Sequence, residues 1–258
     1  MLVNKRRNQI CELIKKHGEV ETTELAKLFA VSIETIRKDL LFLEKEKKLR
    51  KTHGGAVAAE EMKPMHGLSA RRKEFLAEKE ALSEAAMQHI SEGDIIGIDE
   101  GSTAIAFAEA LKKNFSNLTI VTYSLDVFNI LSDHEGFRLI LCGGSFMKSE
   151  RAFCGLQTLD ALRNMSVQKA FIFPTAISLS CGICGYNDDL LQVQRQLIQS
   201  ATTTYILADS SKFEKRAFLR LCDTDENFYY ITDGNLDEKT TKLYLENHIK
   251  LYIGGEKT

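Results

Sequence analysis

The sequence is short of several features that would indicate other classes of protein. Tryptophan is absent, proline occurs twice in 258 residues, and no low-complexity tract interrupts the chain. With 44% hydrophobic and 27% charged residues, the composition excludes a disordered or collagen-like protein and is typical of a globular one. No apolar run approaches the ~18 residues that a membrane-spanning helix needs, and the first ten residues lack the apolar core of a signal peptide. We therefore expect a cytoplasmic protein without a membrane partner.

Cysteine is sparse and scattered, at positions 11, 142, 154, 181, 184 and 222. Without an export signal, this distribution favours reduced thiols over a disulfide framework. Cys181 and Cys184 form the single CxxC pair. Zinc needs about four ligands, and neither a second CxxC nor an HxxxH pair lies nearby, so we expect no metal site and no cofactor. A thiol- or metal-responsive regulator acting through Cys181 and Cys184 remains as an alternative.

The charge of the chain is divided unevenly, although the net charge is only −2. Residues 1–57 hold 13 lysines and arginines against 8 acidic residues, whereas residues 58–258 hold 21 against 28. A short basic N-terminal region followed by a longer acidic region indicates that the basic region contacts nucleic acid. The basic stretch lacks interleaved aromatic residues, which disfavours a stacking platform for single strands. Double-stranded DNA is the partner that this pattern favours.

Three short helices and a hairpin are predicted in the first 57 residues. Apolar periodicity predicts helices over residues 5–17 and 22–30, and Ser32 can cap a third helix. The buried stripe of that third helix should consist of Ile33, Ile36, Leu40 and Leu43. Residues 47–57 are basic and contain two adjacent glycines, as in a β-hairpin. This order of elements predicts a winged helix-turn-helix over residues 1–57.

The rest of the chain is predicted to be a linker over residues 58–74 and an α/β domain over residues 75–258. The linker has one of the two prolines and no apolar periodicity. Beyond a helix that ends near residue 90, strands are predicted at 95–98, 118–121, 139–142, 170–173, 205–208, 228–231 and 251–253, and helices at 104–111, 190–200 and 238–247. Such alternation predicts a mostly parallel sheet.

Two motifs lie near the N-terminus: VSIETIRKDL, residues 31–40, and LRKTHGGA, residues 49–56. Together they resemble the DeoR family of bacterial transcription regulators. The resemblance implies that the third helix enters the major groove of operator DNA, with base contacts specifying the sequence and phosphate contacts setting affinity. It assigns Ser32, Glu34, Thr35 and Lys38 to the bases, Arg37, Lys48, Arg50 and Lys51 to phosphates, and Thr52 and His53 to the same DNA-binding set. Arg37 could serve either role.

The resemblance continues through the α/β domain. DIIGIDEGST, residues 94–103, is similar to the family's D-S-G-T-T loop, and VTYSL, CGG and ADSSKF occur in the family's order. This implies a ribose-5-phosphate-isomerase-like domain that senses phosphorylated sugars or related metabolites without turnover and forms homo-oligomers, dimers or tetramers. The implied effector-binding residues are Asp99, Glu100, Gly101, Ser102, Thr103, Thr122, Ser124, Gly143, Gly144, Arg195 and Lys212.

Several residues depart from the family pattern. Glu100 replaces a small hydroxyl residue, Tyr123 replaces asparagine, and Leu190 and Gln194 stand where glutamate and lysine are usual. An added acid and a lost lysine leave open whether the effector is a phosphate. Leu190 and Gln194 also argue against the alternative of an isomerase-like sugar-phosphate enzyme, which needs an acid/base carboxylate and a lysine in one pocket. The sequence thus predicts a non-enzymatic, sequence-specific regulator of a carbohydrate operon, more often a repressor in this family.

Overall fold

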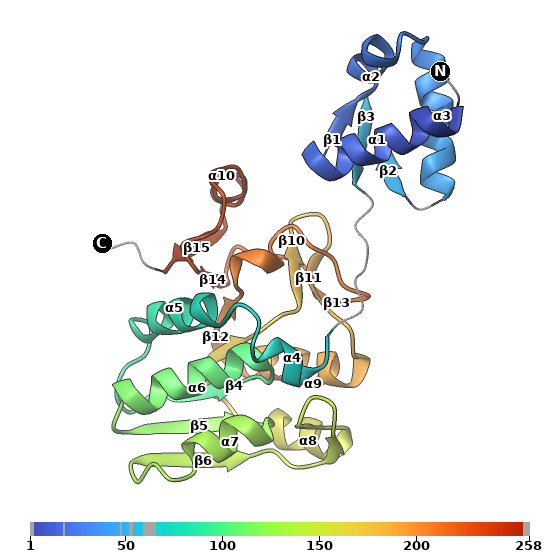
Figure 1. The fold of residues 1–258 in the computed structure, drawn as a ribbon. Coiled ribbons are helices and arrows are strands. Elements are labelled where there is room, and N and C mark those ends of the chain that lie inside the picture. Colours follow the sequence, from blue (N-terminus) through green and yellow to red (C-terminus); the bar gives the residue numbers. More distant parts are fainter. Residues whose placement is uncertain (1–2, 18, 47, 52–53, 59–65, 255–258) are drawn as a thin grey trace. The chain divides into compact units, whose positions relative to one another are not determined.

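The computed structural model describes residues 3–17, 19–46, 48–51, 54–58 and 66–254 (Figure 1). The chain divides into two compact units, Met1–Lys63 and Pro64–Thr258, and each has its own hydrophobic core. The segment 58–74, in which we expected a linker, contains the short helix α4, Leu68–Arg71, whose Leu68 is buried. The second half of this segment therefore packs within the second unit and is not a linker. None of the described helices is long and apolar enough to cross a membrane.

The first unit contains the three predicted helices and a small antiparallel sheet. The helices are α1 (Val3–His17), α2 (Thr22–Phe29) and α3 (Ile33–Lys45), and the strands are β1 (Glu19–Glu21), β2 (Leu49–Lys51) and β3 (Gly55–Ala58). The strand order is β1-β3-β2, which adds a third strand to the predicted hairpin. Gly55 permits this pairing, since a β-carbon there would lie 2.1 Å from the carbonyl oxygen of Val20. The predicted winged helix-turn-helix is confirmed.

Helix α3 packs on the core of this unit through one face. Ile36, Leu40 and Leu43 are at most 1% exposed, as predicted. Ile33 is 43% exposed, so its predicted place in the buried stripe is wrong. Ile33 is the first residue of the helix and projects beyond the core that the later turns contact. The Oγ atom of Ser32 accepts a hydrogen bond from the Thr35 amide at 3.2 Å, which is the predicted N-cap.

The second unit is built on a seven-stranded parallel sheet, ordered β15-β14-β12-β9-β4-β5-β6. Its strands are β4 (Ile95–Ile98), β5 (Leu118–Thr122), β6 (Phe137–Leu141), β9 (Val167–Ile172), β12 (Ala201–Leu207), β14 (Tyr229–Thr232) and β15 (Lys250–Ile253). Each strand overlaps one of the seven predicted strands. The α/β fold class with a parallel sheet is therefore confirmed.

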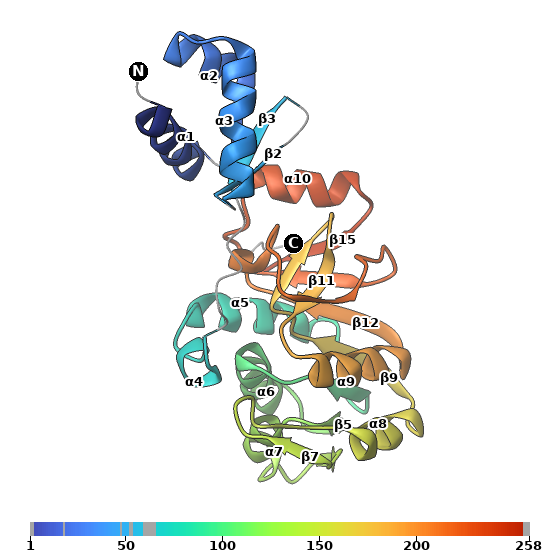
Figure 2. The same ribbon diagram turned by 90° about the vertical axis from the view of Figure 1, so that its right-hand side faces the viewer.

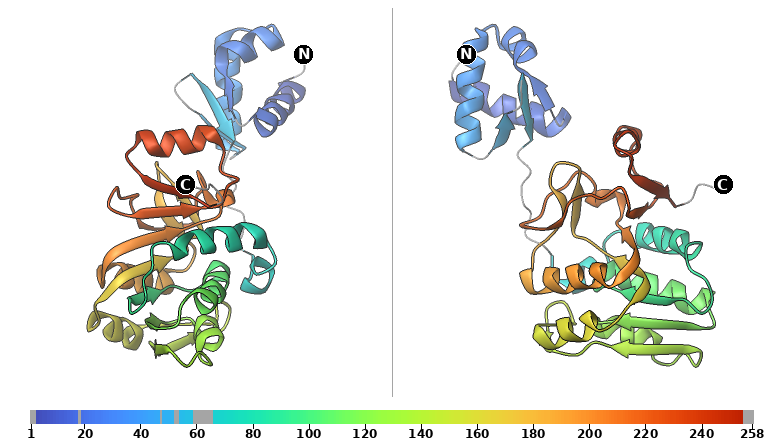
Figure 3. Two further views of the ribbon diagram at one scale, coloured as in Figure 1. Left: turned by 90° about the vertical axis from the view of Figure 1, so that its left-hand side faces the viewer. Right: turned by 180° about the vertical axis from the view of Figure 1, so that it is seen from behind.

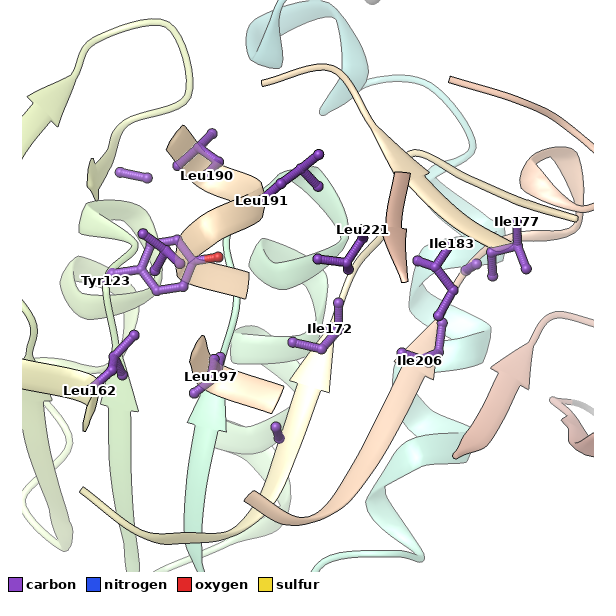
Figure 4. Packing of buried hydrophobic residues seen from close by; sticks show 14 of the residues in the cluster. Tyr123, Leu162, Ile172, Ile177, Ile183, Leu190, Leu191, Leu197, Ile206 and Leu221 are labelled. Carbon is purple, nitrogen blue, oxygen red and sulfur yellow. The ribbon is translucent and has the colours of Figure 1, made fainter. Parts of the chain in front are cut away.

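Helices cover both faces of the sheet (Figure 2, Figure 3). They are α5 (Leu76–Met87), α6 (Ser102–Asn114) and α7 (Leu125–Leu131) on one face and α8 (Leu156–Arg163) and α9 (Asp188–Gln199) on the other, with α10 (Glu238–Glu246) preceding β15. Within β4, Ile96 and Ile98 face the first layer, and Gly97 lies against Leu197 of α9. Figure 4 shows the core on the α8 and α9 side of the sheet, where Leu197 lies in one cluster with Leu162 and Tyr123.

Short antiparallel strands follow several strands of the large sheet. They are β7 (Ser145–Met147) and β8 (Ala152–Cys154), and a separate sheet of β10 (Ala176–Ser178), β11 (Gly182–Gly185) and β13 (Leu219–Cys222). A 3-10 helix, η1 (Ser210–Lys212), follows β12. Because β4, β6, β9 and β12 are parallel, the segments that follow them begin at one edge of the sheet, where ligands bind in open α/β folds.

Candidate functional site

Helix α3 presents a polar surface opposite its buried stripe. Glu34, Arg37 and Lys38 are exposed. Ser32 is exposed and Thr35 half-buried, and their hydroxyl oxygens lie 2.9 Å apart in a hydrogen bond. The N-terminal turn of α3 therefore offers hydroxyl, carboxylate and ammonium groups together, which are groups that read base edges and contact phosphates.

A buried ion-pair cluster fixes α3 on α1. Asp39 is 2% exposed and accepts hydrogen bonds from Nε of Arg6 at 2.6 Å and from Nε of Arg7 at 2.8 Å. The guanidinium of Arg7 also lies 3.7 Å from the ring centroid of Phe42. Sequence analysis missed Arg6 and Arg7, since basic residues in an N-terminal helix have no pattern that indicates a buried partner. This cluster sets which face of α3 remains exposed.

The basic residues of the β2–β3 region are only partly described. Lys48 is exposed, and Lys51 is half-buried, with its backbone amide donating to Oε1 of Glu44 at 2.8 Å. That bond ties β2 to the last turns of α3. The side chain of Arg50 and the whole of Thr52 and His53 lie outside the described residues.

In the second unit, the predicted anion loop connects β4 to α6. Gly101 has φ 115°, a conformation that favours glycine, and Ser102 begins the helix. Ser102 and Thr103 are buried, and the N-cap residue, Gly101, has no side chain that could cap α6. The first amides of a helix carry a partial positive charge and lack partners within the helix. The start of α6 is therefore suited to an anion.

Asp99, which precedes this loop, is completely buried and accepts three hydrogen bonds. Oδ1 accepts from the Tyr123 hydroxyl, and Oδ2 accepts from the Phe173 amide at 2.9 Å and from Nε2 of Gln194 at 2.8 Å. Burial raises the pKa of Asp99 to about 6, which these hydrogen bonds oppose. Tyr123 and Gln194, two separate departures in sequence, are thus partners of one carboxylate.

Glu100 is buried without a hydrogen bond to one of its carboxylate oxygens. It is 8% exposed, and Oε2 has no partner among the described residues. Burial raises the pKa of Glu100 well above its ordinary value, and the charges of Asp99 and Glu150 raise it further, against the effect of Arg71 and Lys212. This side chain has an unused acceptor, or a donor when protonated, beside the start of α6.

Three cations surround the same position. Nζ of Lys212 lies 3.6 Å from Oδ2 of Asp209 and donates to Oγ1 of Thr103 at 3.4 Å. Lys79 donates to the Arg71 carbonyl at 2.6 Å, and burial, followed by the charge of Lys212, lowers its pKa to about 8. Nη1 of Arg71 lies 3.9 Å from the position that a β-carbon on Gly101 would take. The sequence predicted Lys212 for this site, whereas Arg71 fell in the expected linker and Lys79 was not among the predicted effector-binding residues.

Two of the predicted hydroxyl residues, Thr122 and Ser124, form hydrogen bonds with backbone groups around the β5–α7 connection. Oγ1 of Thr122 donates to the Ile98 carbonyl at 2.9 Å and accepts from the Ser124 amide at 3.1 Å. Oγ of Ser124 caps α7 by accepting from the Val127 amide at 3.3 Å. Both hydroxyls therefore have partners within the protein.

The other predicted residues of this set are engaged at different places. The Gly143 carbonyl accepts from the Thr158 hydroxyl at 3.0 Å, and a β-carbon on Gly144 would lie 2.3 Å from that same oxygen. Gly144 therefore allows the loop after β6 to pack on α8, whereas a β-carbon on Gly143 would meet no atom within 4 Å. Arg195 donates to the carbonyls of Leu221 at 2.9 Å and Arg220 at 2.6 Å. Its guanidinium ties α9 to β13, which is not the role we expected for it.

The CxxC pair lies in the β10–β11 hairpin. Cys184 is buried, with Sγ 3.6 Å from the carbonyl oxygen of Cys181, and burial raises the pKa of its thiol. The cysteines of the described chain form no disulfide. Within the described ranges, no three histidine, cysteine or acidic residues gather as metal ligands would.

Comparison with known proteins extends over both units. Residues 6–62 match the DeoR-like helix-turn-helix domain, and residues 74–234 match the DeoR C-terminal sensor domain. The glycerol-3-phosphate regulon repressor of Escherichia coli is 30% identical, covering 98% of this chain and 100% of the repressor. The lactose phosphotransferase system repressor of Staphylococcus epidermidis is 33% identical, covering 92% and 95%.

Among solved structures, ribose 5-phosphate isomerase A from Neisseria gonorrhoeae aligns with a TM-score of 0.39 and 18% identity, over 54% of this chain and 53% of the isomerase. The full-length relatives and the two domain matches, together with the winged helix-turn-helix and the α/β unit, confirm the resemblance: this chain belongs to the DeoR family of transcriptional regulators.

Proposed function

We propose that this protein represses a carbohydrate operon by binding operator DNA through α3 and the β2–β3 hairpin. The observation that carries the proposal is the exposed polar face of α3, with Glu34 and Lys38 in solvent and Asp39 fixing the helix on α1. Ser32, Thr35 and Lys38 contact bases, and Arg37, Lys48, Arg50 and Lys51 contact phosphates. The relatives named above are repressors, which supports repression over activation.

We propose further that the effector is a phosphorylated sugar bound at the start of α6. Lys212, Thr103 and the free amides of α6 are suited to its phosphate, and Glu100 is suited to its hydroxyl groups. The names of two relatives refer to glycerol 3-phosphate and to lactose uptake by a phosphotransferase system, in keeping with this class of ligand. The effector lowers operator affinity if it binds the DNA-free conformation more tightly.

We propose that the working form is a cytoplasmic homo-oligomer. A symmetric dimer presents two copies of α3 to two half-sites of a palindromic operator, spaced by about one helical turn, ~34 Å. Light scattering on the purified protein, alone and with operator DNA, measures the number of subunits.

The DNA-binding proposal is tested by gel shift on the upstream region of the gene's own operon. Lys38→Ala should relax base choice at a cost of about 1–3 kcal/mol, because it removes a base-edge contact. Lys5→Ala, an exposed lysine on α1, is the control for the loss of one charge. Unchanged sequence preference in Lys38→Ala would exclude Lys38 from the reading of bases.

The effector proposal is tested by a thermal-shift screen of sugar phosphates, sugars and sugar acids. A ligand at ~100 times its Kd adds about 2.7 kcal/mol to the free energy of unfolding. We expect hits among sugar phosphates, the same compounds weakening the gel shift, and loss of both effects in Lys212→Ala. A hit that Lys212→Ala binds as tightly as the wild type would place the pocket elsewhere.

A further inference from the structure

The phosphate contacts proposed above lie on one side of α3. Arg37 and Glu44 are seven positions apart, about two turns, and therefore share a side of the helix. Glu44 accepts a hydrogen bond from the Lys51 amide of β2, so the β2–β3 hairpin is on this side too. The major groove is ~12 Å wide and a helix fills it, which leaves a sugar-phosphate backbone along each side of the helix. The side of α3 away from the hairpin has no phosphate contact in the proposal so far.

Arg7 of α1 lies on that other side. Phe42 follows Arg37 by five positions, which is about 140° around the helix, and it is 42% exposed. The Arg7 guanidinium lies 3.7 Å from the centroid of the Phe42 ring. Accepting the DNA-binding function proposed above, we propose that Arg7 binds a phosphate of the backbone that borders α3 on the side away from the hairpin. Arg7 and the hairpin then hold α3 in the groove from its two sides.

Arg7 is the arginine of the Asp39 cluster that has donors to spare. The side chain of Arg7 is 20% exposed, whereas that of Arg6 is 6% exposed. Nε of Arg7 donates to Asp39, and Nη1 and Nη2 have no hydrogen bond to any described residue. One carboxylate between two guanidinium groups also leaves one positive charge without a counter-charge. Two terminal N–H groups on a charged, planar fork match the geometry of a phosphate.

Two residues of α3 orient this guanidinium before DNA arrives. The hydrogen bond to Asp39, at 2.8 Å, fixes the Nε edge, and the ring of Phe42 supports the planar face through a cation–π contact. A side chain that is already oriented loses less conformational entropy on binding. Asp39 is thus a positioning residue for Arg7 as well as the anchor of α3 on α1. The proposal also explains why an aromatic ring is exposed on a DNA-binding helix.

The test is a titration of full-length protein with the upstream DNA of its own operon and with a scrambled duplex of equal length, at 50–200 mM salt. Arg7→Ala should weaken binding to both duplexes by the same factor and reduce the slope of log affinity against log salt by about 0.9. The advantage of the wild type over this variant should therefore fall by about 3.5-fold across the salt range. Lys5→Ala is the matched control, because Lys5 is exposed and lies about 200° around α1 from Arg7. Its slope should equal that of the wild type.

Phe42→Leu tests the supporting ring, since it keeps the ion pair between Arg7 and Asp39. It should weaken binding to both duplexes in the wild-type background and have no further effect in Arg7→Ala, because the ring acts through the guanidinium. Additive losses in the double variant would overturn the orienting role of Phe42.

Arg7→Gln guards against loss of folding, which circular dichroism on heating measures. Glutamine keeps an N–H donor for Asp39 and removes the charge, so it should show the same loss of slope as Arg7→Ala. An unchanged slope in a folded Arg7→Gln protein overturns the phosphate contact, even where affinity falls, because the loss then comes from the packing of α3.

The outcomes separate this inference from the DNA-binding function. An unchanged slope in Arg7→Gln, together with relaxed base choice in Lys38→Ala, overturns the role of Arg7 and leaves the function standing. A wild-type protein that binds the upstream DNA no more tightly than the scrambled duplex overturns the proposed function, and this inference with it.

Discussion

Gly97 in β4 is where a single added methyl group should most clearly disturb the packing of α9 on the sheet. A β-carbon there would lie 2.5 Å from Cδ1 of Leu197 and 3.4 Å from Cγ2 of Val167. Leu197 is fully buried and cannot turn into solvent. The φ of Gly97 is not in the left-handed region, so backbone strain adds nothing. We expect Gly97→Ala to lower the free energy of unfolding by about 1–3 kcal/mol, the usual cost of overpacking.

A double-mutant cycle assigns this cost to one contact. Leu197→Ala alone should cost about 2–5 kcal/mol by opening a cavity. In the double variant, the methyl group added at position 97 occupies part of that cavity, so the total should fall short of the sum by about 1 kcal/mol or more. Gly143→Ala is the control, since a β-carbon at 143 meets no atom within 4 Å. It should change stability by less than about 1 kcal/mol.

Tyrosine fluorescence during urea unfolding is the assay. All seven tyrosines lie between residues 123 and 252, and the chain has no tryptophan, so the signal reports on the second unit alone. Additive costs in the double variant, or a Gly97→Ala protein as stable as the wild type, would refute the packing argument. Because α9 also carries Gln194, which donates to Asp99, Gly97→Ala should weaken effector binding as well.

The remaining predictions concern a helix cap, a phosphate contact and a buried acid. Ser32→Ala should destabilise the first unit by about 1 kcal/mol by removing the N-cap of α3, and Ser32→Asp should restore it, as circular dichroism on heating would show. Lys51→Ala should weaken binding to all DNA sequences alike and reduce the slope of log affinity against log salt by about 0.9, the loss of one phosphate contact; an unchanged slope would exclude that contact. Because the pKa of Asp99 is raised by burial from 3.8 to about 6, the folded state binds its proton more tightly than the unfolded state. The stability of the wild type relative to Asp99→Asn should therefore fall as pH rises from about 4 to above 6, and a rise over this range would contradict the assignment.

Local sequence determined the order of elements and the family. The strands of the large sheet could be predicted because each is a compact apolar run, and α3 because Ile36, Leu40 and Leu43 recur at helical spacing after a capping serine. Lys212 and the Gly101 turn could be predicted from family-like motifs. These features depend on residues that are neighbours along the chain.

Tertiary structure decided which polar groups meet. Tyr123 and Gln194 lie 24 and 95 positions from Asp99 in the chain, yet both donate to its carboxylate. Arg71 reaches Glu150 across 79 positions, and Arg195 donates to β13 instead of lying with Lys212. The strands that sequence analysis missed have three or four residues, too few to show a period. Side-chain partners depend on how the helices and loops pack around the sheet edge, and no local pattern specifies that packing.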